Sequence, residues 1–110
     1  MVECHDATSP GELLYYEDLG FCKAGEAARL LEDGDTCHTG RIPFNPSGGL
    51  TSRGHPVGAT GLAQIAEAVW QLRGEAEGRQ IARARVALAQ NSGGWLEGDS
   101  AAGVATVLAR

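Results

Sequence analysis

The stretch from Asn45 to Gly61 decides how this chain is interpreted, and it reads NPSGGLTSRGHPVGATG. Its loop portion is rich in glycine, with Gly48, Gly49 and Gly54. Glycine permits backbone angles that other residues avoid and a close approach by a ligand or a second backbone. Pro56 suits the first turn of a helix, where its missing N–H costs nothing. The pattern therefore predicts a glycine-rich loop that delivers His55 to the N-cap of a helix or to its immediate neighbourhood.

A histidine in that position is a candidate general base. The helix dipole and the unpaired N–H groups at a helix start disfavour imidazolium, so we expect the His55 ring to be neutral near pH 7. A neutral imidazole can accept a proton. Nucleotide binding is disfavoured, because His55–Pro56 stands where a phosphate-binding loop has Lys followed by Ser or Thr. The alternative interpretation is a structural turn with an incidental histidine.

The length and composition of the chain predict one small domain over residues 1–110. Its hydrophobic content is 43% and its net charge is −5, without a basic patch for nucleic acid. The apolar runs are shorter than the roughly 20 residues of a membrane span, and no signal peptide is recognisable, so a cytoplasmic location is expected. The three cysteines lack C-x-x-C spacing, which suits free thiols in a reducing compartment.

Local signals in the first half of the chain predict a strand followed by two helices. Residues 3–8 alternate weakly, which is typical of a short strand. Ser9 to Glu12 match a capping box, which predicts a helix over about 10–19. A short helix is expected over 26–32. Two prolines predict an extended segment over 40–46.

The second half predicts a long helix and two strands. A helix over 56–73 is expected to bury one apolar face, formed by Leu62, Ile65, Ala66, Val69, Trp70 and Leu72. Strands are expected over 83–89 and 103–108, joined by a loop of about 8 to 10 residues that begins with the turn signal Asn91–Gly94. Together these elements predict an α/β arrangement with a sheet of three strands.

The motif N-P-S-G-G-x-x-x-x-G-H-P-x-G-A-T-G resembles the C-terminal histidine motif of the thiolase superfamily. The segment VECHDAT at 2–8 is similar to V-E-x-H-D-C-F of the sterol-carrier-protein-type and lipid-transfer branch. Essentially the whole chain falls within this resemblance, but it matches only the last part of a thiolase. The resemblance implies a partial thiolase-like C-terminal domain, with a mixed sheet and a central buried helix, that is incomplete as an isolated chain. An uncovered apolar sheet edge and helix face would then require oligomerisation or a partner chain carrying the N-terminal half.

The resemblance also implies a chemistry and a set of site residues. The substrate would be a coenzyme A thioester, with no permanently bound cofactor and no metal, and the reaction would make or break a carbon–carbon bond. His55 would activate a nucleophilic cysteine on the partner chain, while His5 would hold a water or a substrate oxygen. For His5 the alternative is a hydrogen-bonded core histidine. The expected substrate-binding residues are Asn45, Gly48, Gly49, Gly54, Gly93 and Gly94.

Two departures from the thiolase pattern remove residues that this chemistry would use. Ala7 stands where the branch has the cysteine of H-D-C-F, and the C-terminal loop lacks the C-x-G cysteine. None of the three cysteines present lies at a glycine-flanked helix start that would activate a thiol, and Cys4 is expected on the face opposite to His5. The chain alone should therefore be inert. Replacement proton donors would be Tyr15, Tyr16, Glu97 or Asp99.

Several alternatives stay open from sequence. Loss of both acid/base cysteines leaves room for a retro-aldol lyase of the lipid-transfer type, for which a partner with an OB-fold and a zinc ribbon is expected. The chain could instead be a non-catalytic structural or acyl-binding component of a thiolase-like complex, or a free-standing acyl-binding domain. His38 is expected to be a surface residue. The adjacent pairs Cys4–His5 and Cys37–His38 have poor spacing for zinc, because neighbours on an extended chain point to opposite faces.

Overall fold

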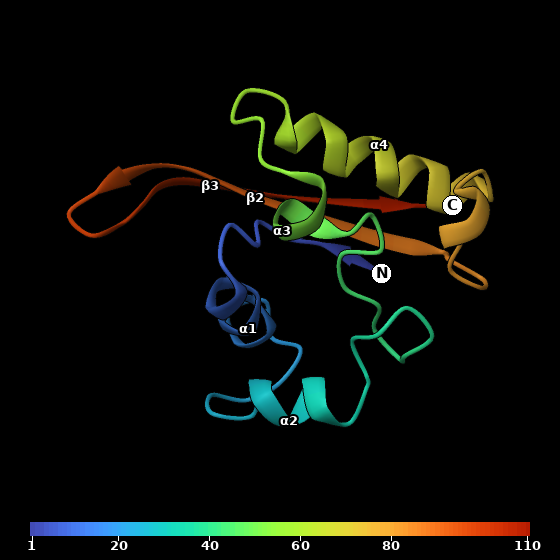
Figure 1. The fold of residues 1–110 in the computed structure, drawn as a ribbon, viewed down its shortest axis with the longest axis horizontal. Coiled ribbons are helices and arrows are strands. Elements are labelled where there is room, and N and C mark those ends of the chain that lie inside the picture. Colours follow the sequence, from blue (N-terminus) through green and yellow to red (C-terminus); the bar gives the residue numbers. More distant parts are fainter.

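A three-stranded mixed sheet crosses the middle of the molecule (Figure 1). The computed structural model describes residues 1–110. The strand order is β1 (Val2–Glu3), β2 (Val86–Leu96) and β3 (Asp99–Ala109), with β1 parallel to β2 and β2 antiparallel to β3. The α/β class and the mixed sheet of three strands expected from the sequence are confirmed.

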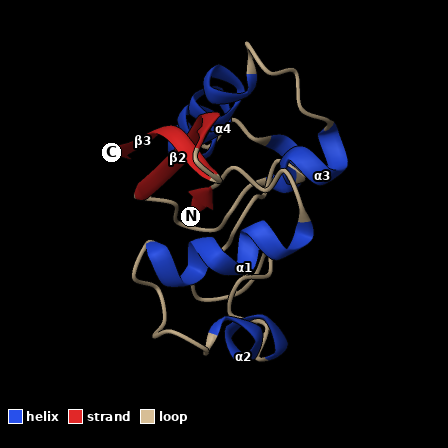
Figure 2. Cartoon of the chain, turned by 90° about the vertical axis from the view of Figure 1, so that its left-hand side faces the viewer, coloured by secondary structure: helices blue, strands red, loops and turns tan.

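Helices lie on both sides of this sheet (Figure 2). α4 (Thr60–Arg73) runs along one face over β2, while α1 (Ser9–Asp18) and α2 (Ala27–Glu32) lie on the other side. These two N-terminal helices match their predictions to within one residue at each end. A short helix, α3 (Gly49–Arg53), and a single 3₁₀ turn, η1 (Glu77–Arg79), complete the helices.

The start of α1 is not the predicted capping box. Thr8 is the N-cap residue and makes no side-chain capping bond. The Glu12 carboxylate instead accepts hydrogen bonds from the Tyr16 hydroxyl and from the Asn45 amide at 2.8 Å. Tyr16 is fully buried, and a buried hydroxyl needs an acceptor, so Glu12 serves the interior rather than the helix end.

β1 is much shorter than the strand predicted over residues 3–8. Strand pairing ends after Glu3, because the N–H groups of Cys4 and His5 donate to side-chain amides, at 2.9 and 3.0 Å, instead of to a neighbouring strand. The prediction was therefore wrong beyond Glu3. His5 lies just past the end of β1.

The two C-terminal strands form one long hairpin, and the predicted loop of 8 to 10 residues was wrong. Both strands are 11 residues long, and pairing continues to Leu96 opposite Asp99. Glu97 and Gly98 have φ angles of 52° and 92°, which suit a two-residue hairpin turn whose twist matches that of the strands. The supposed turn signal at Asn91–Gly94 is part of β2. The hairpin projects beyond the rest of the molecule (Figure 1).

α4 begins four residues later than predicted and buries the predicted face only in part: Leu72 is buried, whereas Leu62 and Trp70 are exposed. Its buried residues recur at helical spacing and are mostly polar: Thr60, Gln64, Glu67, Ala68, Gln71 and Leu72. The polar ones are satisfied internally; Gln64 donates to the Gln90 carbonyl at 2.9 Å, and Glu67 pairs with Arg79 at 3.0 Å. On the predicted apolar face, Leu62 is 74% exposed and Trp70 is 43% exposed. The helix is buried along one face only.

Two small apolar clusters flank the sheet. On the α1 side, the cluster consists of Val2, Cys4, Tyr16, Ala27, Leu30 and Phe44. On the α4 side it consists of Ala68, Leu72 and Ala87. Phe44 joins β1 through an isolated parallel bridge to Val2, as expected for an extended segment. The prediction of an extended chain over 40–46 was wrong on either side of it, because residues 40–42 form bends and Asn45 has a positive φ of 47°. Two neighbouring residues of β2 point to opposite clusters, Leu88 to the one beside α1 and Ala87 to the one beside α4, as the pleat of a strand requires.

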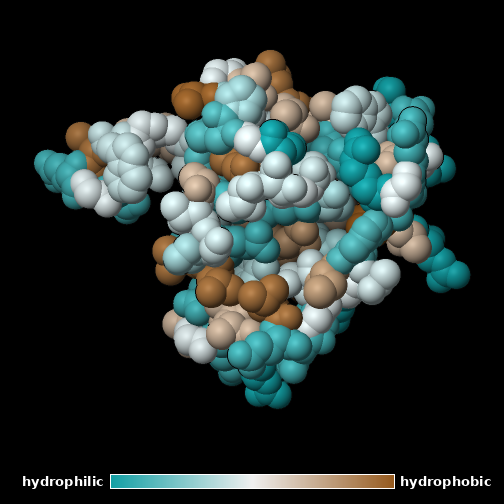
Figure 3. All heavy atoms as spheres, viewed as in Figure 1, coloured by the Kyte–Doolittle hydropathy of each residue, from teal (hydrophilic) through white to brown (hydrophobic).

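Apolar side chains remain at the surface of α4 and β3. Figure 3 shows hydrophobic atoms at the surface near the start of α4 and a larger group of them over α1. Val104 and Val107 of the edge strand β3 are 63% and 67% exposed, and Leu62 of α4 adds to the exposed apolar residues. An unpaired edge strand beside an apolar helix face is the incompleteness expected from the sequence. None of the helices is long and apolar enough to cross a membrane.

Candidate functional site

The two predicted catalytic histidines meet, although 50 residues separate them in the sequence. The ring centroids of His5 and His55 are 4.8 Å apart, with the rings at 82° in an edge-on contact. His5 follows β1, and His55 lies in the loop between α3 and α4. The site therefore joins the end of a strand to the loop ahead of the long helix.

His55 is not at a helix N-cap, which corrects the sequence prediction. The N-cap residue of α4 is Ala59, and Pro56 belongs to the preceding turn, where its carbonyl accepts the Ala59 N–H at 2.8 Å. The left-handed Gly54, with φ at 91°, ends α3 just before His55. The helix-dipole argument for a neutral ring therefore does not apply to His55.

A hydrogen bond to Thr60 fixes the His55 tautomer instead. His55 Nδ1 lies 2.7 Å from Thr60 Oγ1, and the Thr60 hydroxyl lies 3.1 Å from the Pro56 carbonyl oxygen. A carbonyl oxygen can only accept, so the single hydroxyl proton is directed to Pro56. Thr60 Oγ1 must then accept from His55, which places the proton on Nδ1 and leaves the lone pair on Nε2. That nitrogen has the form of a general base.

His5 sits in a different environment. Its Nδ1 faces Asn91 Nδ2 at 3.2 Å and Ser92 N at 3.4 Å, both on β2. Burial, followed by the nearby His55, lowers the pKa of His5, while the neighbouring Asp6 acts in the opposite direction. The His5 ring is therefore neutral at physiological pH.

The two histidines differ in exposure, and neither lines the two main pockets of the chain. His55 is exposed, and His5 is half-buried. A pocket of about 480 Å³ lies between α4 and the end of β3, and another of about 360 Å³ lies beside α1. Neither pocket is lined by His5 or His55.

Asp6 anchors the start of α3 and was missed by the sequence analysis. Its carboxylate is almost fully buried and accepts hydrogen bonds from Leu50 N at 2.7 Å and from the Thr51 hydroxyl at 3.0 Å. Gly49 has φ at 63°, and a Cβ there would lie 2.2 Å from an Asp6 oxygen. The close approach predicted for Gly49 is thus made by a side chain of the same protein.

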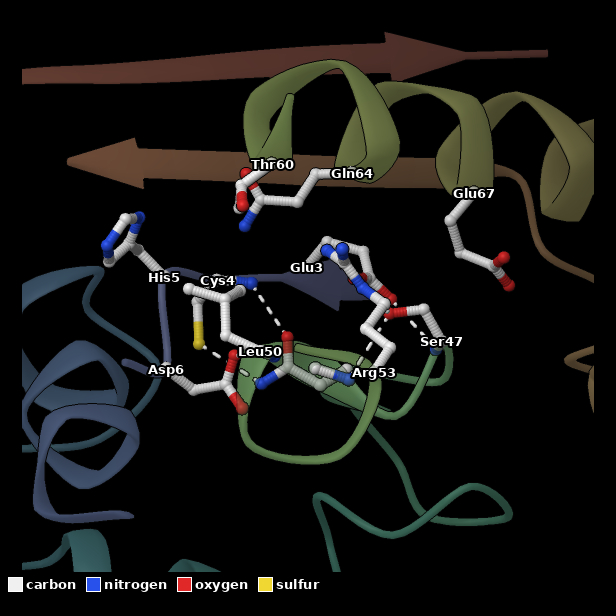
Figure 4. Close-up of polar contacts among 12 residues, drawn as sticks. Glu3, Cys4, His5, Asp6, Ser47, Leu50, Arg53, Thr60, Gln64 and Glu67 are labelled. Atoms are coloured by element: carbon white, nitrogen blue, oxygen red, sulfur yellow. Dashed lines mark hydrogen bonds and ion pairs between the residues drawn. The ribbon is translucent and has the colours of Figure 1, made fainter. Parts of the chain in front are cut away.

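A buried carboxyl cluster ties both ends of α3 to β1 (Figure 4). Glu3 is fully buried and accepts hydrogen bonds from Ser47 N at 3.0 Å and Ser47 Oγ at 2.6 Å. Arg53 lies 4.0 Å from the same carboxylate and donates to Ser47 Oγ at 3.1 Å. Burial raises the pKa of Glu3 to about 7, although the Ser47 hydrogen bonds lower it and Glu67 raises it further. Arg53 is two residues before His55, so this cluster supports the histidine loop.

The predicted substrate-binding residues are spread over three places. Asn45 uses its side chain internally, accepting from Cys4 N at 2.9 Å and donating to Glu12 at 2.8 Å. Gly48 and Gly54 flank α3 with positive φ angles. Gly93 and Gly94 continue β2 directly after Ser92, which contacts His5. A role of these residues in substrate binding stays a prediction.

The cysteine and tyrosine side chains near the site differ in burial and in their hydrogen-bond partners. Cys4 is fully buried beside Asn45, and burial raises the pKa of its thiol, which makes it a poor nucleophile. Burial, followed by the hydrogen bond to Glu12, raises the pKa of Tyr16.

The other candidate proton donors lie in two places. The Tyr15 hydroxyl lies 2.9 Å from the Oγ of Ser92, whose backbone N–H contacts His5. Glu97 lies in the hairpin turn and Asp99 directly follows it, at the tip of the projecting hairpin (Figure 1).

Metal ligands do not gather anywhere in the chain. No group of three or more His, Cys, Asp or Glu side chains is close enough together to hold an ion. Cys37 and His38 are exposed residues of the turn region after α2.

Sequence reasoning missed the polar residues that orient the two histidines. Figure 4 shows Thr60 and Gln64 projecting from α4 toward the segment that carries His5. Thr60 belongs to the quoted motif but was interpreted only as part of a helix start. Asn91 was interpreted as a turn residue because glycines follow it. A polar stripe at helical spacing on α4 is the signal that could have revealed this buried network.

Comparisons with known proteins give a consistent picture. A family model described as thiolase C-terminal domain-like matches residues 1–107. The chain is 56% identical over 94 residues to acetyl-CoA acetyltransferase of Methanothermobacter thermautotrophicus, covering 86% of this chain and 24% of that protein. It is also 56% identical over 93 residues to sterol carrier protein 2 of Homo sapiens, covering 84% of this chain and 17% of that protein.

A solved structure, an Ltp2–ChsH2(DUF35) aldolase, is similar to this fold with a TM-score of 0.73. The sequence identity is 32%, and the match covers 81% of this chain and 22% of that chain. The chain thus spans a quarter or less of the length of these relatives.

Proposed function

Because this chain belongs to the thiolase C-terminal domain-like family, we propose that it forms the C-terminal part of a thiolase-like enzyme that makes or breaks a carbon–carbon bond in a coenzyme A thioester. The observation that carries this proposal is the contact between His5 and His55 at 4.8 Å, with the lone pair of His55 on Nε2. A base next to a second, neutral imidazole suits acyl transfer through a covalent thioester intermediate.

Each histidine has a separate role in this proposal. His55 Nε2 takes the proton from a cysteine thiol, and the resulting thiolate attacks the thioester carbonyl carbon. His5 donates a hydrogen bond to the oxygen on which negative charge develops. The acyl group then rests on the cysteine, and the coenzyme A thiol leaves with a proton. The cysteine belongs to a partner chain that supplies the N-terminal half.

The exposed apolar surface over α4 and β3 supports such a partner. Leu62 on α4 and Val107 on β3 are exposed on elements whose other faces are packed. The matched region makes up a quarter or less of the length of the relatives. Association with the N-terminal half would cover these surfaces and complete the walls around the two histidines.

A retro-aldol lyase is the second candidate. The similarity to an aldolase structure favours it, and so does Ala7, which replaces the cysteine that would exchange protons with the substrate α-carbon. In that case an OB-fold and zinc-ribbon protein would accompany the complex. A purely structural or acyl-binding role is the third reading, and it makes both histidines dispensable for turnover.

One experiment separates these candidates. The chain is fused in place of the matching segment of the Methanothermobacter acetyltransferase, and labelled acetyl-CoA is used to measure acetylation of the enzyme. Acyl transfer predicts labelling that falls by about 10²-fold or more in His55→Ala. The exposed His38→Ala is the matched control and should keep full labelling. Equal labelling of the chain and of His55→Ala would remove the role of His55 as base.

The aldol reading gives a different result in the same fusion. It predicts no acetyl-enzyme but cleavage of a β-hydroxyacyl-CoA to an aldehyde or ketone and a shorter thioester. A structural role predicts labelling or cleavage that neither histidine substitution changes.

A further inference from the structure

The amide of Asn91 supplies the only side-chain donor that the structure places on His5 Nδ1. Asn91 Nδ2 lies 3.2 Å from that nitrogen, and the backbone N–H of Ser92 points to it from 3.4 Å. A backbone N–H can only donate, and an amide nitrogen can only donate. Both partners therefore require a lone pair on His5 Nδ1. In a neutral ring the proton must then be on Nε2.

Gln64 fixes which way the Asn91 amide is turned. Gln64 Nε2 donates to the Gln90 carbonyl at 2.9 Å, so its other atom, Oε1, is turned toward Asn91 and accepts from Asn91 Nδ2 at 3.0 Å. Gln64 is fully buried in α4. Reversing its amide would place two donors against each other at Asn91 and two acceptors at Gln90. The two N–H bonds of Asn91 thus have one acceptor each, Gln64 and His5.

The backbone of His5 is held by the same strand. Its N–H donates to Gln90 Oε1 at 3.0 Å, and Gln90 Nε2 donates to Ser92 Oγ at 2.8 Å. Position and ring orientation of His5 are therefore both set by β2, with Gln64 on α4 as the outer support. Such outer hydrogen bonds commonly decide which histidine nitrogen carries the proton.

We propose that Asn91, oriented by Gln64, is a positioning residue that holds His5 as the Nε2–H tautomer and so makes it a hydrogen-bond donor beside the base His55. The use of that N–H toward a thioester oxygen rests on the proposed function. The tautomer of His5 rests only on the hydrogen bonds described above. The two rings then present opposite atoms at one site: a proton on His5 Nε2 and a lone pair on His55 Nε2.

The charged and titratable groups around His5 are few. His55 faces it from the α3–α4 loop, and Asp6 follows it in the chain, with its carboxylate engaged by α3. The Tyr15 hydroxyl of α1 reaches Ser92, which contacts the His5 ring. The elements packed against His5, β2 and α4, present the amides of Asn91, Gln90 and Gln64 and the hydroxyls of Ser92 and Thr60. A carboxylate in place of the Asn91 amide should therefore be the largest change in charge next to the His5 ring.

The test is a long-range ¹H–¹⁵N correlation spectrum of the 110-residue chain labelled with ¹⁵N-histidine. Only three histidines are present, and His5→Gln and His38→Gln assign the signals. The expected spectrum of the unsubstituted chain shows His5 with an unprotonated Nδ1 and a protonated Nε2. A His5 ring with its proton on Nδ1 would overturn the proposal without any Asn91 or Gln64 variant.

Asn91→Asp reverses the hydrogen-bonding character at Nδ1. It should move the His5 proton to Nδ1 or make the ring cationic, raising the titration midpoint of His5 by about one unit or more. Gln64→Leu, which removes the support of Asn91, should give a mixture of tautomers. The exposed His38 is the internal control in every spectrum and should not change.

Unchanged His5 signals in Asn91→Asp would refute the positioning role. If Asn91→Asp does not fold, the tautomer of His5 in the unsubstituted chain and the Gln64→Leu spectrum still show whether Asn91 and Gln64 position the His5 ring. A chain with the expected tautomer whose fusion nevertheless forms no acetyl-enzyme would count against the proposed function and leave this inference standing.

Discussion

The buried carboxyl of Glu3 should make the stability of this chain depend on pH in a way that one substitution removes. Glu3 is fully buried, and burial raises its pKa from the ordinary value of 4.5 to about 7. Between these two values, the unfolded chain has lost the Glu3 proton and the folded chain has kept it. The folded state binds more protons there, so stability falls as pH rises through this window.

The magnitude follows from the shift. A difference of about 2.5 pKa units corresponds to about 3 kcal/mol, fully present below pH 4.5 and lost as pH rises through 7. Glu3→Gln cannot ionise, and its amide oxygen can still accept from Ser47. The free energy of unfolding of the unsubstituted chain, minus that of Glu3→Gln, should therefore fall by about 3 kcal/mol from pH 4.5 to pH 8.

Urea unfolding at a series of pH values and one fixed protein concentration measures this difference. Glu32→Gln, at an exposed position of α2, controls for the removal of a carboxyl group. If Glu3→Gln shows the same pH dependence as the unsubstituted chain, then Glu3 is not the buried acid described here. That result would also remove the support proposed for the loop that carries His55. Glu3 accepts a hydrogen bond from Ser47 and lies 4.0 Å from Arg53, two residues before His55.

Three other outcomes follow from the packing. Gly49→Ala should destabilise the chain by about 2 kcal/mol or more in urea unfolding, because its Cβ would lie 2.2 Å from an Asp6 oxygen at a positive φ; a smaller cost in the Asp6→Gly background would identify the clash, and an equal cost would argue against it. Leu62→Glu should leave the unfolding free energy within about 0.5 kcal/mol, since Leu62 is 74% exposed, yet abolish co-purification with an N-terminal half; normal co-purification would show that α4 is not covered by that partner. A thiol reagent should modify the exposed Cys37 at once and the buried Cys4 only on unfolding, as followed by mass spectrometry, and early modification of Cys4 would contradict its burial.

The family and the α/β class could be predicted from the sequence. The motif around His55 and the segment around His5 singled out both histidines through the family resemblance, but their contact at 4.8 Å was seen only in the structure. Helices α1 and α2 were found to within one residue because a proline start and glycine-rich ends mark them locally.

The parts that could not be predicted depend on contacts far apart in the sequence. β1 ends early because Asn45 and Gln90 capture its N–H groups. The buried face of α4 is mostly polar because Gln64 and Glu67 find partners on β2 and in η1, which helical periodicity alone does not reveal. Of the apolar residues that marked the predicted face of α4, Leu72 is buried, while Leu62 and Trp70 are left exposed by this chain.

In the proposed function, His55 acts as the base for a cysteine supplied by another chain. The most direct measurement is the rate at which iodoacetamide alkylates that cysteine in a complex of this chain with the N-terminal half of the Methanothermobacter relative. The thiolate is the reactive form, so the unsubstituted chain should accelerate alkylation at least tenfold over His55→Ala, while His38→Ala matches the unsubstituted chain. Equal alkylation rates with His55 and with alanine at that position would contradict the account.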